Sequence, residues 1–252
     1  MIHRLRRHPF AVEARFEHCL VLTYAVPAER LEPLLAPGLR PDRSGDDGFL
    51  AIALVQTRGL RPAGAPRVLG QDFFLSGYRV FARFRTRDGR TLRGLRILRS
   101  DTDKRRMAWA GNLLTHYRYR LCRARVDVDG TMAVTVRTPG GEADLDVRAD
   151  LRAADAPPAG SPLRDLREAR KFAGPLPFTF DHEPQTGSIV VIEGRRASWD
   201  PRPVTVEAHR SAFLERAGFA DARLASAFYV HGIDYRWERG VLEPLPARGE
   251  PS

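Results

Sequence analysis

The sequence predicts an α+β fold of mainly antiparallel sheet, closed or strongly curved into a β-barrel, with a few helices packed outside it. Three observations lead to this prediction: segments of β-forming residues recur along the chain, two Asp-Gly turns join neighbouring segments, and only a few short stretches show helical spacing. One domain is common for 252 residues of β-rich sequence. We expect it over residues 10–245, with flexible termini at 1–9 and 246–252.

Two long strands are predicted in the first quarter of the chain. Residues 12–26 form an apolar run of β-formers that Pro27 ends. A short helix follows, because leucines at helical spacing precede a Pro-Gly stop. After the Asp47-Gly48 turn, residues 49–57 form the second strand.

The clearest local pattern is a hairpin of residues 78–85 and 92–98, joined at Asp88-Gly89. Apolar and polar residues alternate along it, so one face is expected in the core and the other is largely cationic. Like charges on facing strands repel, so solvent, nearby carboxylates or an anionic substrate must offset them. The arginines of this face are Arg79, Arg83, Arg85, Arg93 and Arg96.

Helices are predicted at three later places. The first spans 100–116, where Ser100 and Asp103 form an acidic variant of the capping box. The others span 161–170 and 207–217. The remaining strands are listed by range: 117–128 and 131–138, which form a second hairpin at Asp129-Gly130, then 187–193, 203–206 and 222–237.

The net charge of +10 and the isoelectric point near 10.5 raise the question of a nucleic-acid partner. The arginines are spread along the chain among carboxylates, which disfavours that partner. No apolar run is long enough to span a membrane, and no export signal is recognised, so a cytoplasmic location is expected. Cys19 and Cys122 are expected to be buried free thiols, as in a reducing compartment.

Motifs for cofactors and metals are missing from the sequence. The histidines show no ligand spacing, and Asp181-His182-Glu183 is expected in a loop. Glycine-rich nucleotide loops and the serine-hydrolase elbow are absent as well. We therefore expect no cofactor and no metal.

Only two of the 41 basic residues are lysines, Lys104 and Lys171. Drift of composition toward arginine explains this, and so does a need for a neutral amine, which arginine cannot supply. Lys104 lies at the expected start of the first helix, followed by Arg105 and Arg106. Cationic neighbours and the helix N-terminus favour a neutral amine, whereas Asp101 and Asp103 oppose it. Lys104 is the candidate nucleophile, and an exposed helix-start lysine is the alternative.

The chain resembles the bacterial YqjF-like family of unknown function over roughly residues 10–245. The order of the matching segments carries this resemblance. They are residues 26–39, 47–55 with Gly59-Leu-Arg-Pro62, 73–84, 100–119, and 193–206 with Trp199 and Pro203.

That family is similar to the acetoacetate-decarboxylase-like superfamily, which implies a closed barrel with an enclosed cavity and a lysine that forms a Schiff base with a β-keto acid. The resemblance puts Lys104-Arg105 near the paired lysines of the decarboxylase. Asp103-Lys104-Arg105 stands where the decarboxylase has Pro-Lys-Lys, and Gly94-Leu-Arg96 lacks the glutamate of its Gly-Arg-Glu.

The leading hypothesis is a barrel that binds a small anionic organic molecule, with Schiff-base lyase chemistry at Lys104 on a keto acid. The expected carboxylate-binding residues are Arg79, Arg83, Arg96 and Arg105. The alternatives are a non-catalytic ligand-binding or sensor barrel and a basic nucleic-acid-binding protein. Whether the chain is an enzyme and whether it forms a homo-oligomer stay open at this point.

Overall fold

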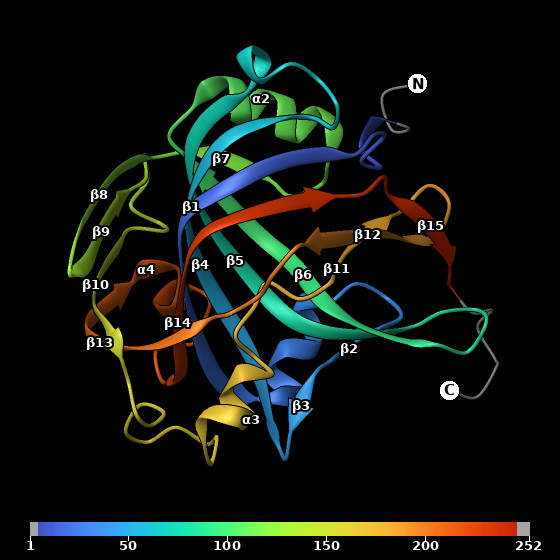
Figure 1. Cartoon of the computed structure of the whole chain (residues 1–252). Helices are drawn as coiled ribbons and strands as arrows, with labels where there is room; N and C mark the ends of the chain where they lie inside the picture. The colour runs from blue at the N-terminus through green and yellow to red at the C-terminus, as the bar shows by residue number, and fades with distance from the viewer. Residues whose placement is uncertain (1–4, 246–252) are drawn as a thin grey trace.

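The computed structural model describes residues 5–245, which contain fifteen strands in one mixed, mostly antiparallel sheet. Seven of the strands form a ring in the order β12-β11-β6-β5-β4-β1-β14, and pairing between β14 and β12 closes it (Figure 1). The strongly curved, mainly antiparallel architecture confirms the predicted fold class.

The strands of the ring are β1 (Val12–Pro27), β4 (Asp47–Pro62), β5 (Gln71–Arg85), β6 (Thr91–Thr102), β11 (Phe178–Glu183), β12 (Ser188–Arg196) and β14 (Arg223–Trp237). β1 has antiparallel partners along nearly its whole length, β4 on one side and β14 on the other. β11 and β6 are parallel, so the ring joins segments from both halves of the chain.

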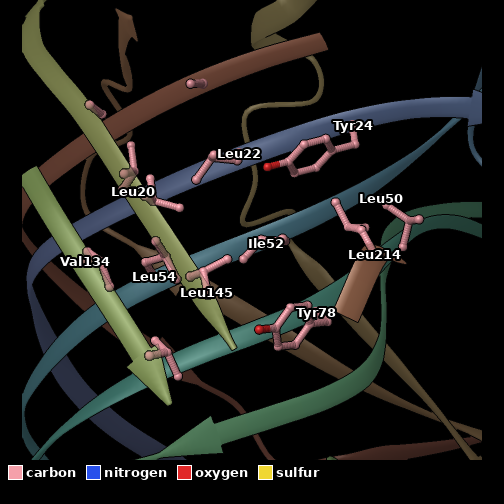
Figure 2. Packing of buried hydrophobic residues seen from close by; sticks show 14 of the residues in the cluster. Leu20, Leu22, Tyr24, Leu50, Ile52, Leu54, Tyr78, Val134, Leu145 and Leu214 are labelled. Atoms are coloured by element: carbon pink, nitrogen blue, oxygen red, sulfur yellow. The ribbon is translucent and has the colours of Figure 1, made fainter. Parts of the chain in front are cut away.

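A second group of strands covers one outer face of the ring. It consists of β8 (Arg123–Asp129), β9 (Thr131–Arg137), β10 (Leu145–Ala153) and β13 (Arg202–Ser211), with α4 (Ala212–Arg216) beside them. Figure 2 shows Val134 and Leu145 of this group, whose strands cross in front of the ring strands, in one cluster with Leu20, Ile52 and Tyr78. Alternate residues of a strand point to opposite faces, so Leu20 packs in this outer core while Cys19 and Val21 belong to a second core on the inner side.

The remaining elements are short. They are η1 (Ala28–Leu34), β2 (Leu39–Pro41), β3 (Arg43–Ser44), η2 (Arg67–Leu69), α2 (Arg105–Leu114), β7 (Tyr119–Leu121), α3 (Leu166–Arg170) and β15 (Val241–Pro244). Helices α2 and α3 lie at opposite ends of the ring (Figure 1). Helix α2 contributes to the cavity described below.

Several predicted elements are confirmed: the two long N-terminal strands, the short helix between them, both Asp-Gly hairpins and the last long strand. The prediction of a helix from Ser100 is wrong, because β6 continues to Thr102 and α2 begins at Arg105. The Asp103 carboxylate does not cap that helix. It accepts a hydrogen bond from the Phe74 backbone N–H (2.8 Å), which fixes the end of the hairpin instead.

The two later helices are shorter than predicted, the strand predicted at 203–206 is longer than expected, and strands such as β10 and β11 were missed. β13 runs to Ser211 because it pairs with β10, which the sequence pattern did not reveal, and α4 begins only after it. The loop expected around His182 is strand β11, which is held between β6 and β12. Both errors have the same cause, since pairing with a distant strand overrides a weak local pattern.

Cys19 and Cys122 are buried free thiols. No helix among residues 5–245 is long and apolar enough to cross a membrane. Of the termini expected to be flexible, at 1–9 and 246–252, residues 1–4 and 246–252 lie outside the described residues.

A candidate ligand cavity inside the strand ring

A cavity of about 290 Å³ lies inside the ring, beneath α2. Its walls are mostly apolar, which is typical of small-molecule sites. The strands contribute Phe16, Val55, Leu75, Leu95 and Ile97 among others, and α2 contributes Met107, Ala110 and Leu114. Among ligand pockets this volume is at the small end, so the cavity suits a compact molecule.

The Arg79 side chain lies in this cavity, and two features of the backbone make room for it. It lies on β5, where a bulge opposite β6 interrupts the register between Tyr78 and Arg79. A bulge re-aims the side chains beside it. Gly77, two residues earlier on the same face, leaves the room: a Cβ there would lie only 3.0 Å from Nε and Nη2 of Arg79.

Three other arginines of the hairpin, two of which were predicted to bind a carboxylate, are already neutralised. Arg83 and Arg93 are direct cross-strand neighbours, and the fully buried Asp42 carboxylate pairs with both, at 2.6 Å from Nε of Arg83. Arg96 pairs with the buried Asp181 of the neighbouring β11. Carboxylates of the protein therefore neutralise the positive charge at these three positions.

Arg79 has no such partner. No carboxylate of residues 5–245 forms an ion pair with it, and its buried Nε atom makes no hydrogen bond there. Arg79 is partly buried, and taking a cation out of water without a partner costs free energy. Arg85 forms no ion pair within the described residues either, but it is exposed to solvent near the hairpin turn. Arg79 is the partly buried arginine of this face that is left without a carboxylate, and it points to an anion that residues 5–245 do not supply.

Two tyrosines from the segment after α2 share the cavity with Arg79. The buried Tyr117 hydroxyl has the Thr179 side chain as a polar neighbour, and it forms no hydrogen bond of ordinary geometry within residues 5–245. Burial raises the pKa of Tyr117 well above its usual range and that of Tyr119 to about 12, although the Arg79 charge opposes both shifts. Both hydroxyls therefore stay protonated at neutral pH and can donate hydrogen bonds.

Helix α2 holds Tyr119 in place. The Asn112 side chain accepts from the Tyr119 backbone N–H and donates to its carbonyl, both at 2.8 Å. Gly111 allows the contact, because a Cβ there would lie 2.3 Å from the Tyr119 ring. The pair Gly111–Asn112 therefore fixes the wall of the cavity under the helix.

The N-terminal segment covers another part of the cavity wall. His8 is buried there, donating its backbone N–H to Leu114 of α2 and accepting from Gly240 N–H. Burial lowers the pKa of the His8 imidazole to about 4, with backbone hydrogen bonding opposing the shift. The imidazole is neutral at physiological pH and adds no second cation.

The other candidate residues lie away from the cavity. Lys104 precedes α2 with its side chain 55% exposed, and its Nζ lies 3.5 Å from Asp103. Arg105, the first residue of α2, is exposed. Lys171 is exposed after α3. Neither lysine lines the described cavity, so the structure brings only Arg79, of the predicted site residues, into it.

Sequence reasoning missed the polar groups that accompany Arg79. Tyr117 and Tyr119 were not among the predicted site residues, and Thr179 lay in a segment with no predicted structure. Gly77 in the middle of a strand was the available signal, because such a glycine often marks a close approach. No group of three His, Cys, Asp or Glu side chains in residues 5–245 is arranged to hold a metal ion.

The cavity can therefore bind an anionic head through Arg79, donate a hydrogen bond from Tyr117 and enclose an apolar body. Its described walls carry neither an amine nor a carboxylate.

Comparisons with known proteins agree with this fold. Residues 13–234 match the family model of DUF2071, described as an uncharacterized conserved protein. A search of curated proteins gave no match. The structure is similar to that of an acetoacetate decarboxylase-like enzyme from Sphingomonas wittichii RW1 (TM-score 0.63, 13% identity, 94% of each chain covered).

Two further solved structures share the architecture. Acetoacetate decarboxylase from Legionella pneumophila gives a TM-score of 0.60 at 11% identity, over 93% of this chain and 87% of that one. The enduracididine biosynthesis enzyme MppR, complexed with pyruvate, gives 0.57 at 14% identity, over 93% and 90%. The fold is that of acetoacetate-decarboxylase-like proteins, as the sequence resemblance implied.

Proposed function

The chain belongs to DUF2071, a family of uncharacterized conserved proteins, and has an acetoacetate-decarboxylase-like fold; from this premise we propose that it binds a small carboxylic acid in the cavity of the ring, with Arg79 holding the carboxylate. The observation that carries the proposal is the unpaired Arg79 guanidinium. A carboxylate satisfies such a fork through two parallel hydrogen bonds. MppR, with a similar fold, was solved with pyruvate.

The rest of the cavity narrows the ligand class. A single unpaired arginine among apolar walls favours one negative charge on the buried part of the ligand. The Tyr117 hydroxyl is placed to donate to a second polar atom, such as a keto or hydroxyl oxygen. The ligand is therefore a compact acid with one further acceptor and an apolar remainder.

A decarboxylase-like reaction on a small keto acid is the second candidate, and the fold is the observation that favours it. That reaction by a Schiff base needs a neutral amine at the substrate carbonyl. The exposed Lys104 beside Asp103 gives this chemistry no support, so carboxylate binding is the primary proposal and Lys104 chemistry a separate hypothesis.

Titration calorimetry with matched ligand pairs tests the proposal. Pyruvate, acetoacetate and benzoate are each compared with the corresponding primary amide. We expect one or more acids to bind at one site and the amides to bind about 10- to 100-fold more weakly, as for the loss of a charge-assisted hydrogen bond. Arg79→Gln should reduce acid binding by a similar factor and leave amide binding unchanged.

Arg83→Gln is the matched control, because it removes the same charge from the same strand outside the cavity. Its affinity for the acids should equal that of the native chain. If Arg83→Gln and Arg79→Gln weaken binding equally, general electrostatics and not a cavity site explain the binding. Tyr117→Phe should weaken keto acids about 5- to 10-fold and leave simple alkanoates unaffected.

A further inference from the structure

A second hollow lies next to the cavity, at the end of the ring where β1 begins and β4, β12 and β14 end. It is a groove of about 800 Å³ between β1, the end of β4 with η2, and the paired ends of β12 and β14. Seven of its thirteen lining residues are arginines and two are carboxylates. The groove therefore presents guanidinium groups, whereas the cavity presents apolar walls.

Most of the groove arginines have carboxylate partners. Five of them form ion pairs, which hold the side chains in the wall of the groove. These pairs are Arg15 with Asp234, Arg58 with Glu17, Arg61 with Glu13, Arg195 with Glu193, and Arg236 with Glu238.

Arg67 and Arg196 differ from the other five. No ion pair joins either of them to a carboxylate within residues 5–245. Arg67 is exposed on η2. The Arg196 guanidinium lies 4.5 Å from the Trp199 ring centroid, a stacking that fixes its plane. It also hydrogen-bonds to the Tyr235 side chain, and its remaining N–H groups are available to an acceptor.

The groove and the cavity share a wall. Arg61 and Tyr235 line both. Burial raises the pKa of Tyr235, and the charges of Arg196 on the groove side and Arg79 on the cavity side both oppose that shift. Tyr235 therefore lies within electrostatic reach of the unpaired arginines of both hollows.

We propose that the groove binds a phosphate or diphosphate group of the same ligand whose carboxylate reaches Arg79, so that the ligand is a phosphate-bearing organic acid. This inference rests on the proposed function. Arginine forks match phosphate oxygens bidentately. Several charges do not fit among the apolar walls of the cavity, whereas the open groove can solvate them.

The arrangement of charges favours a small ligand over nucleic acid. Phosphate-backbone binding depends on many uncompensated cations along a path. Here five of the seven groove arginines are neutralised, and two remain unpaired, which suits one compact phosphate group.

Calorimetry at constant ionic strength tests the groove first with inorganic pyrophosphate alone. We expect pyrophosphate to bind at one site. Arg67→Glu and Arg196→Gln should each weaken pyrophosphate binding at least about 10-fold, as expected for a lost charge-assisted contact. Arg79→Gln should leave it unchanged. Arg87→Glu is the matched control, because Arg87 is exposed in the β5–β6 loop and does not line the groove.

The link between the hollows is tested with ω-phosphonoalkanoic acids of increasing chain length, each compared with the plain alkanoic acid of that length. At one length the phosphonate should add at least about 10-fold in affinity, and Arg67→Glu should remove that gain. If no length shows a gain, or if Arg87→Glu removes it equally, the inference is wrong even where plain acids bind. Pyrophosphate binding without any acid binding would instead contradict the proposed function. Binding of a single-stranded oligonucleotide without preference for the phosphonates would overturn the inference in favour of a nucleic-acid surface.

Discussion

Near the β5–β6 turn, Arg83 and Arg93 face each other, and the buried Asp42 carboxylate binds both. Four residues earlier on β5, Arg79 enters the cavity without a carboxylate partner among the described residues. On the same strand, Arg83 is therefore neutralised by a buried carboxylate of the protein, whereas Arg79 has no carboxylate partner within residues 5–245. The difference teaches that an arginine-rich face is informative only once the partner of each arginine is known.

The largest effect is expected where the arginines are neutralised. Asp42→Asn removes the charge that separates two facing guanidinium groups, and it leaves a buried amide in place of a fully buried carboxylate. We expect the free energy of unfolding in urea to fall by about 3 kcal/mol, as for a broken buried ion pair. Asp200→Asn, which changes an exposed carboxylate paired with Arg170, should alter the free energy of unfolding far less. Equal effects of the two variants would remove the structural role assigned to Asp42.

Replacing Arg79, the arginine of the cavity, should raise the free energy of unfolding instead. Arg79→Met removes an unpaired charge and fills similar space with an apolar side chain, so the free energy of unfolding should rise by about 1 to 2 kcal/mol. Urea unfolding of the native chain and the variant measures this change. A loss of stability like that of Asp42→Asn would show that Arg79 has a structural partner and that the comparison fails.

The buried His8 imidazole at the edge of the cavity should make the stability of the chain depend on pH. Its pKa is lowered from 6.5 to about 4 by burial, so the unfolded chain binds the extra proton between those values. Stability is therefore lost as the pH falls from 6.5 toward 4, by about 2 kcal/mol between pH 7 and 4.5. His8→Asn suits the positive φ of 54° and should remove this part of the pH dependence. If the native chain and His8→Asn lose the same free energy of unfolding as the pH falls, the His8 imidazole does not cause this pH dependence.

The smallest effect is expected at Lys104. Because its amine is exposed beside Asp103, Lys104→Arg should change neither stability nor acid binding. Borohydride reduction in the presence of acetoacetate or pyruvate, followed by mass spectrometry, should give no adduct at this position. An adduct at Lys104 that is absent from Lys104→Arg would instead revive the Schiff-base hypothesis.

The sequence predicted those parts of the fold that local patterns encode. Both hairpins follow from Asp-Gly turns within a few residues of the strands they join. The closure of the ring does not, because β11 pairs in parallel with β6, some eighty residues away, and β12 pairs with β14. The capping box at Ser100 failed for a similar reason, since Asp103 bonds to Phe74 on another strand.

The site was predicted only in part, again because contacts between residues distant in sequence decide it. Arg79 was among the expected binding residues, but the sequence did not distinguish it from Arg83 and Arg96. Their partners, Asp42 and Asp181, are distant in sequence and become neighbours only in the folded chain. The emphasis on Lys104 came from composition and family resemblance, neither of which reports where a side chain points.

The central claim is that Arg79 is kept unpaired in order to bind a ligand carboxylate. The most direct measurement is the difference in affinity between one acid and its amide, determined for the native chain and for Arg79→Met. We predict that the native chain prefers the acid by about 10- to 100-fold and that the variant shows no preference. A preference that survives in Arg79→Met would contradict the claim.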